Sequence, residues 1–166
     1  MATVQDLASY LIPRAMAPRE YVSLPRLIKL MYLADWREAL ICQSQITNVQ
    51  WSIGPCGPSS DDIYEQLKKD VGSFVLLDVK DRFGNPKKVV EKAVKDAAIC
   101  GLTDQQKDAA DFIIGIAKNR PWESLTSIVS STYPVATREP GSVLNLPALA
   151  REYQNEILPL LRSRKH

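Results

Sequence analysis

Histidine is almost absent from this chain, because its 166 residues contain a single histidine, His166, at the last position. General acid–base and nucleophilic catalysis commonly need a histidine that a rigid scaffold holds within hydrogen-bond reach of the substrate. A terminal histidine is poorly placed for that task, so we expect neither a Ser-His-Asp nor a Cys-His catalytic centre. Clustered zinc ligands are missing as well.

Cysteine and glycine are both few and scattered. Cys42, Cys56 and Cys100 are odd in number and lack the spacing of a metal knuckle or a redox motif. Free thiols suit a reducing compartment, and we therefore expect a cytoplasmic protein. The seven glycines form neither a P-loop nor a G-x-G-x-x-G fingerprint. We expect no cofactor and no metal.

Long apolar runs and a strong charge imbalance are also missing. No run is long and apolar enough to span a bilayer, and residues 1–6 do not resemble a signal peptide. The net charge of +2 is too small to indicate a nucleic-acid partner. Basic residues gather at Arg162, Arg164 and Lys165, which we interpret as a solvated tail. The composition is that of one globular domain over residues 1–166.

The paired carboxylates Asp61 and Asp62 are the most obvious candidates for acid–base chemistry. At a helix start, however, such a pair commonly complements the helix dipole. No other catalytic group accompanies it in the sequence, and we therefore predict that the protein is not an enzyme.

Apolar residues recur at helical spacing through most of the chain. The predicted helices cover 2–16, 24–42, about 59–69, 103–117, 121–133 and 146–160. Residues 24–42 are apolar on most sides, which is typical of a central helix. Residues 73–91 read as a β-hairpin, and 135–145 read as a loop. The predicted fold is mainly α (α+β), a compact bundle of about six helices around a central apolar helix, with a small β-hairpin.

Local signals support several of these elements. Ser23 is the expected N-cap of the central helix, and Thr103 with Gln106 forms a capping box. In the hairpin, Lys87 and Lys88 are interpreted as discouraging pairing at an exposed edge, although such an edge can also extend a partner's sheet. Trp122 is interpreted as a core residue.

A short extended stretch, residues 46–53, leads into Gly54-Pro55-Cys56-Gly57-Pro58. Repeated Gly-Pro pairs exclude helix and predict a rigid turn. A preordered turn next to Trp51 is a candidate binding surface, because preordering lowers the entropy cost of association and tryptophan is a frequent hot-spot residue. The alternative is that Trp51 covers the core while the prolines end a strand.

Asp35 is unusual because it is a charged residue within the apolar central helix, close to Tyr32 and Trp36. A buried charge is costly unless it is paired and hydrogen-bonded. We favour a scaffold role for Asp35, such as anchoring the backbone of the Gly-Pro turn, over a direct contact with a partner.

Two blocks of this sequence resemble the Panacea-domain family, also called SocA-like or GepA-like antitoxins. The first is a K-L-x-Y-x-A helix and the second a Gly-Pro turn about twenty residues later. The matching residues are Lys29, Leu30, Tyr32, Leu33, Ala34, Trp51, Gly54, Pro55, Gly57 and Pro58. The blocks cover residues 24–70, and weaker similarity extends to about 155. Ser127–Pro134 resembles a later helix of the family, with Ser130-Ser131-Thr132 where many relatives carry a histidine.

The resemblance implies an antitoxin of a bacterial or phage toxin–antitoxin system that silences a cognate toxin protein by direct binding. The residues that we predict to bind the partner are Tyr32, Trp36, Trp51, Gly54, Pro55, Gly57 and Pro58. One alternative is a proteolytic adaptor that delivers a client to an ATP-dependent AAA+ protease, with the tail from Arg162 as tether. A small-molecule enzyme is another alternative. A nucleic-acid-binding repressor is disfavoured, since no helix-turn-helix pattern is present.

Overall fold

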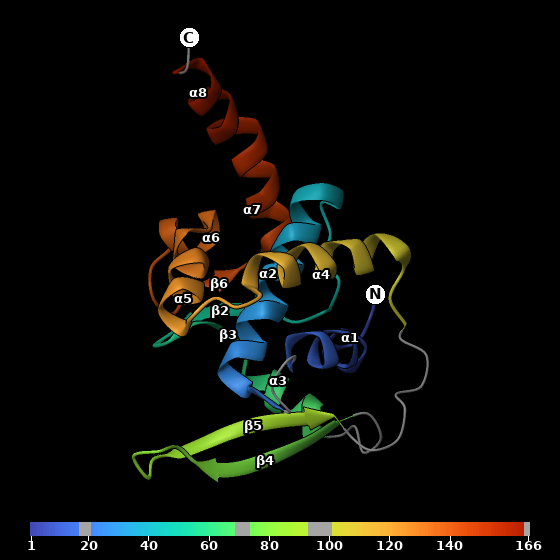
Figure 1. Cartoon of the computed structure of the whole chain (residues 1–166). Helices are drawn as coiled ribbons and strands as arrows, with labels where there is room; N and C mark the ends of the chain where they lie inside the picture. Colours follow the sequence, from blue (N-terminus) through green and yellow to red (C-terminus); the bar gives the residue numbers. More distant parts are fainter. Residues whose placement is uncertain (17–20, 69–73, 93–100, 165–166) are drawn as a thin grey trace.

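The computed structural model describes residues 1–16, 21–68, 74–92 and 101–164. At its centre lies α2 (Leu24–Cys42), and helices α1 (Val4–Met16), α4 (Asp104–Ala117), α5 (Trp122–Ser131) and α7 (Leu146–Glu152) pack around it (Figure 1). The mainly helical fold with a central helix is therefore confirmed. Cys100, Lys165 and His166 lie outside the described residues.

The central helix has the predicted bounds because strong signals stand at both ends. The Ser23 side chain accepts a hydrogen bond from the Arg26 amide at 3.3 Å, and Pro25 occupies the first turn. Gln43 adopts a left-handed conformation (φ 55°), and its amide donates to the Ala39 carbonyl. The helix is buried on most of its circumference, as its apolar composition indicates. It is nevertheless not long and apolar enough to cross a bilayer, nor is any other helix in the described part of the chain.

The predicted hairpin is present as β4 (Phe74–Lys80) and β5 (Pro86–Lys92), with Gly84 at φ +84° in the turn. A third strand, β1 (Tyr21–Ser23), pairs antiparallel with β5, so that the strand order is β1-β5-β4. Lys87 and Lys88 lie on β5 just before the three residues that pair with β1, so this part of β5 has a paired neighbour only in β4 among the described residues. That the two lysines discourage pairing at this edge stays a prediction.

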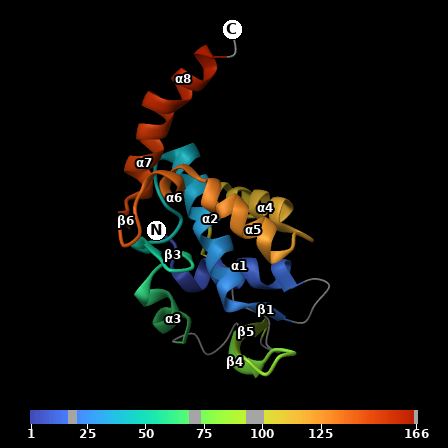
Figure 2. The ribbon, with the colours of Figure 1, turned by 90° about the vertical axis from the view of Figure 1, so that its left-hand side faces the viewer.

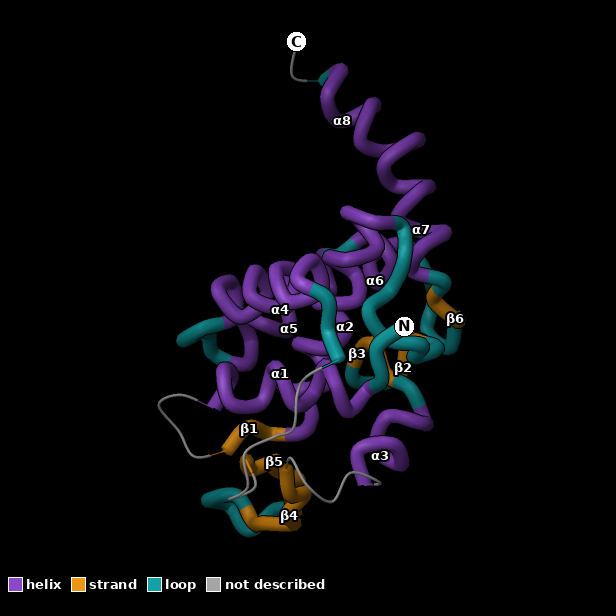
Figure 3. The backbone as a smooth tube through the Cα atoms, turned by 90° about the vertical axis from the view of Figure 1, so that its right-hand side faces the viewer, coloured by secondary structure: helices purple, strands orange, loops and turns teal. Residues whose placement is uncertain are grey.

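A second antiparallel sheet lies apart from the first (Figure 3), with strand order β3-β2-β6. It contains β2 (Trp51–Gly54), β3 (Gly57–Ser59) and β6 (Val143–Leu144), and α3 (Asp61–Lys68) follows β3. The predicted loop over 135–145 is thus partly wrong. It contains the end of α6 (Tyr133–Thr137) and the whole of β6, whose short pairing with Trp51 and Ser52 left no sequence signal.

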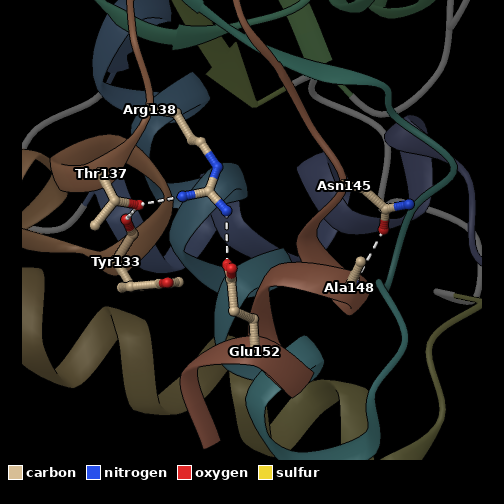
Figure 4. Close-up of polar contacts among 6 residues, drawn as sticks. All are labelled: Tyr133, Thr137, Arg138, Asn145, Ala148 and Glu152. Carbon is tan, nitrogen blue, oxygen red and sulfur yellow. Dashed lines mark hydrogen bonds and ion pairs between the residues drawn. The ribbon is translucent and has the colours of Figure 1, made fainter. Parts of the chain in front are cut away.

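The last helix continues as a rod that projects away from the body (Figure 2). It consists of α7, a π-helical turn at Tyr153–Ile157 and α8 (Leu158–Ser163). Arg138 fastens the preceding segment to this rod, because its guanidinium contacts the Glu152 carboxylate at 2.6 Å and donates to Thr137 Oγ1 at 3.0 Å (Figure 4). Asn145 caps α7 by accepting from the Ala148 amide.

Candidate functional site

The Asp35 carboxylate is fully buried and accepts hydrogen bonds from the segment that leads into β2 and from the first residue of β2. One oxygen accepts from the Ile46 and Thr47 amides, each at 3.0 Å. The other accepts from Thr47 Oγ1 at 2.6 Å and from the Trp51 indole at 2.8 Å. Burial raises the pKa of Asp35 to about 6, while the hydrogen bonds from Thr47 and Trp51 act in the opposite direction. Asp35 thus joins α2 to the extended segment before the Gly-Pro turn.

The three aromatic residues predicted to bind a partner, Tyr32, Trp36 and Trp51, are all buried. Tyr32 meets Trp51 edge-to-face, with ring centroids 5.5 Å apart. The Thr132 hydroxyl already donates to the Val129 carbonyl, so Tyr32 must be the donor in its 2.8 Å bond to Thr132. In this conformation the three rings offer a partner almost no surface, and the position of Trp51 is that of a core residue.

Lys29 holds the Gly-Pro turn. The expectation that Asp35 anchors the backbone of this turn is wrong. Lys29 Nζ donates to the Cys56 carbonyl at 2.8 Å. Gly57 has φ +106°, and a Cβ at this position would lie 3.0 Å from Lys29 Nζ. A Cβ on Gly54 would lie 2.8 Å from Ser59 Oγ. The backbone conformation therefore requires a glycine at Gly57, whereas at Gly54 a side chain would displace the Ser59 hydroxyl.

A groove of about 1230 Å³ runs beside this turn. Its walls come from the N-terminal end of α2, the Gly-Pro turn, strands β1 and β5, and the corner before α5, which meet around the lower end of α2 in Figure 1. The tertiary structure therefore brings together segments that lie far apart in the sequence. Of the predicted partner-binding residues, Pro55, Gly57 and Pro58 line the groove.

Positive charge dominates this groove. Its lining contains five cationic side chains and one carboxylate, that of Asp81; the cations are Arg26, Lys29, Lys87, Lys88 and Arg120. Lys88 is neutralised by Asp78 at 2.8 Å. Converging carboxylates, which would have supported a small-molecule enzyme, are not found among the described lining residues.

Trp122 lies in the same groove, and its interpretation as a core residue is wrong. Trp122 is the first residue of α5, and 40% of its surface is exposed. Lys29 Nζ lies 5.1 Å from the centre of its ring, within cation–π distance. Lys29 itself is only 3% exposed, and burial lowers its pKa. Trp122 thus offers a partner the broad aromatic surface that was expected of Trp51.

Sequence reasoning missed Arg26, Arg120 and Trp122 as groove residues, and it used Lys29 only as part of a motif. A signal for Lys29 was present, since a lysine within the apolar run 27–34 of a central helix needs a partner in the fold. Arg26, Arg120 and Trp122 had no such signal. Their relation depends on how the start of α2 and the corner before α5 pack.

No group of three or more metal-ligating side chains occurs in the described ranges. Cys42 and Cys56 are free and exposed, and Cys56 lines the groove. The arrangement is that of a basic groove with one exposed aromatic ring beside the Gly-Pro turn.

A family model described as "Antitoxin SocA-like, Panacea domain" matches residues 27–133, well over half of the chain. The match extends from α2 through the Gly-Pro turn and the hairpin to the end of α5, and it includes most of the groove. No curated protein and no solved structure matches the chain. With the central helix and the turn in the places that the sequence motifs indicate, the chain belongs to the SocA-like antitoxin family with a Panacea domain.

Proposed function

We propose that this protein neutralises a cognate toxin protein by binding it directly, without catalysis, and that the groove beside the Gly-Pro turn is the contact surface. Family membership over residues 27–133 supports the antitoxin role. The observation that carries the choice of surface is the exposed Trp122 ring next to the rigid turn in a large groove.

Two properties of the groove favour tight binding of a protein. The turn is already ordered by the Lys29–Cys56 hydrogen bond and by Gly57, so that little conformational entropy is lost when a partner docks. Trp122 supplies an anchor of the type that dominates binding energy at protein interfaces. The prolines of the turn present rigid apolar surface beside it.

Co-expression with the protein encoded by the adjacent gene tests the proposal. We expect that protein to arrest growth when expressed alone, growth to recover when this chain is co-expressed, and the two proteins to purify as a stable complex. An adjacent product that is harmless alone, or equally toxic in the presence of this chain, would contradict the antitoxin role.

A second candidate function, delivery of the toxin to an ATP-dependent AAA+ protease, is favoured by the rod. An adaptor needs a second contact surface, and the exposed Leu160 and Leu161 lie on the part of the rod that projects beyond the body (Figure 2). With purified protease, toxin and ATP, an adaptor shortens the toxin's half-life, and the double variant Leu160→Ala/Leu161→Ala abolishes that effect while toxin binding persists. An unchanged half-life with the wild-type chain contradicts this function.

A further inference from the structure

Lys29 carries a buried ammonium group without a counter-charge. Its side chain is 97% removed from solvent, and Nζ contacts the Cys56 carbonyl and faces the Trp122 ring. It forms no ion pair with any residue of the described ranges, whereas Lys88 and Arg138 each have a carboxylate partner. A buried cation is costly unless an anion accompanies it. A negative charge brought to Lys29 would supply the counter-charge that the described residues do not.

The other charged residues that line the groove also favour a negatively charged partner. Five cations and one carboxylate line it, and Asp78 pairs with Lys88, which leaves an excess of three positive charges, whereas the complete chain has 21 basic and 19 acidic residues, an excess of two. The positive charge is therefore concentrated here. Such local excess attracts an acidic partner and accelerates encounter with it.

The size and walls of the groove favour a polypeptide over a small anion. Pockets for small molecules typically measure about 300 to 1000 Å³, and this groove exceeds that range at about 1230 Å³. Its apolar walls come from the Trp122 ring and from prolines, namely Pro25, Pro55, Pro58, Pro86 and Pro121. Such walls accommodate an extended chain with alternating apolar and charged side chains.

We infer that the groove receives an extended acidic segment of the toxin, with one of its carboxylates seated against Lys29 and an adjacent apolar side chain against Trp122. This inference rests on the proposed antitoxin function and specifies the chemistry of its partner. The carboxylate would supply the ion pair that Lys29 lacks among the described residues, in addition to its hydrogen bond to the Cys56 carbonyl.

Binding of the adjacent gene's product to matched charge variants tests the inference. Lys87→Glu places a negative charge in the groove, and Lys80→Glu makes the same change on the hairpin outside it. We expect Lys87→Glu to raise the Kd about tenfold or more at low salt, and Lys80→Glu to leave it nearly unchanged. For Lys29→Met we expect a Kd about 10- to 100-fold higher, against no change for Lys107→Met. Circular dichroism and thermal melting report whether each variant is folded.

Overlapping peptides of about 12 residues from the toxin sequence identify the segment, since extended peptides of this length span about 40 Å. We expect an acidic peptide to bind the wild-type chain, to lose binding when its Glu or Asp residues are replaced by Gln or Asn, and to compete with the whole toxin. Binding of a basic or uncharged peptide in place of an acidic one would overturn the inference. So would binding of ATP to the wild-type chain that is lost in Lys29→Met.

The outcomes separate the inference from the function on which it rests. If the toxin is neutralised and bound equally by the wild type, Lys29→Met and Lys87→Glu, the acidic-segment inference is wrong and the antitoxin function stands. If the wild-type chain neither binds nor neutralises the toxin, both are wrong.

Discussion

The Trp51 indole donates a hydrogen bond to the Asp35 carboxylate at 2.8 Å, with both side chains fully buried. This bond links the two sequence blocks that carry the family resemblance, one in the central helix α2 and the other in β2. Lys29 precedes Asp35 by six residues on α2, and its ammonium group donates to the Cys56 carbonyl in the Gly-Pro turn. The central helix thereby holds the chain at two places, the segment from Ile46 to Trp51 through Asp35 in the core and the Gly-Pro turn through Lys29 in the groove.

Replacement of Asp35 by asparagine tests the first contact. An amide nitrogen would replace one of the two oxygens that accept from the backbone, Thr47 and Trp51, so at least one donor would face another donor. We expect the free energy of unfolding at pH 7 to fall by about 3 kcal/mol. Urea denaturation measures the change. The exposed Asp108→Asn serves as control, with an expected change within about 0.5 kcal/mol; a comparable effect of both variants would contradict the anchoring role.

We expect the free energy of unfolding to depend on pH through the titration of Asp35. Burial raises its pKa to about 6 in the folded chain, against 3.8 for an exposed carboxyl. Between these values the folded state holds a proton that the unfolded chain releases. The contribution of Asp35 to the free energy of unfolding therefore decreases as the pH rises from about 4 to about 6, by about 3 kcal/mol in total, and levels off above.

Urea denaturation of the wild type and Asp35→Asn across this range isolates the contribution, because other carboxyl groups titrate in both proteins. We expect the stability advantage of the wild type to be larger at pH 4 than at pH 7. A difference that stays constant with pH would show that Asp35 titrates normally.

Gly57→Ala tests the geometry of the turn. Its φ of +106° is unfavourable for any residue with a side chain, and the added Cβ would lie 3.0 Å from Lys29 Nζ. We expect a loss of about 1 to 3 kcal/mol in stability together with weaker toxin binding, because Lys29 must move. Gly115→Ala is the matched control, since open space surrounds Gly115 in α4 and alanine there should stabilise the helix by about 0.5 to 1 kcal/mol. Thermal melting that ranks the two variants in the opposite order would refute this account.

Trp122→Ala tests the groove as the toxin-binding surface. If Trp122 anchors the toxin, its truncation should weaken binding by about 2 kcal/mol or more, roughly thirtyfold in Kd, with a small effect on folding because the ring is half exposed. Phe83→Ala at the hairpin tip removes an even more exposed aromatic ring from outside the groove and should leave the Kd unchanged. Isothermal titration with the purified toxin measures both. Equal affinities for Trp122→Ala and the wild type would place the interface elsewhere.

Several elements could be predicted from the sequence because their signals are local. Ser23 and Pro25 mark the start of α2, and the capping box at Thr103 and Gln106 forms as predicted, with both reciprocal hydrogen bonds. The hairpin was indicated by its apolar strands and its Gly-Asn-Pro turn. The family was evident from the spacing between the Lys-Leu-x-Tyr-x-Ala helix and the Gly-Pro turn.

By itself, then, the sequence determined the bounds of the central helix, the Gly-Pro turn and the family, since capping and backbone restriction are local and the two motif blocks lie within about twenty residues of each other. Tertiary packing alone decided that Trp51 is enclosed while Trp122 is exposed, because burial depends on which elements cover a side chain. It also brought Lys29, Cys56 and Trp122 together, although they lie in separate segments of the chain. The groove exists because α2, β5 and α5 converge on one turn, and contacts between such distant segments leave no periodic pattern in the sequence.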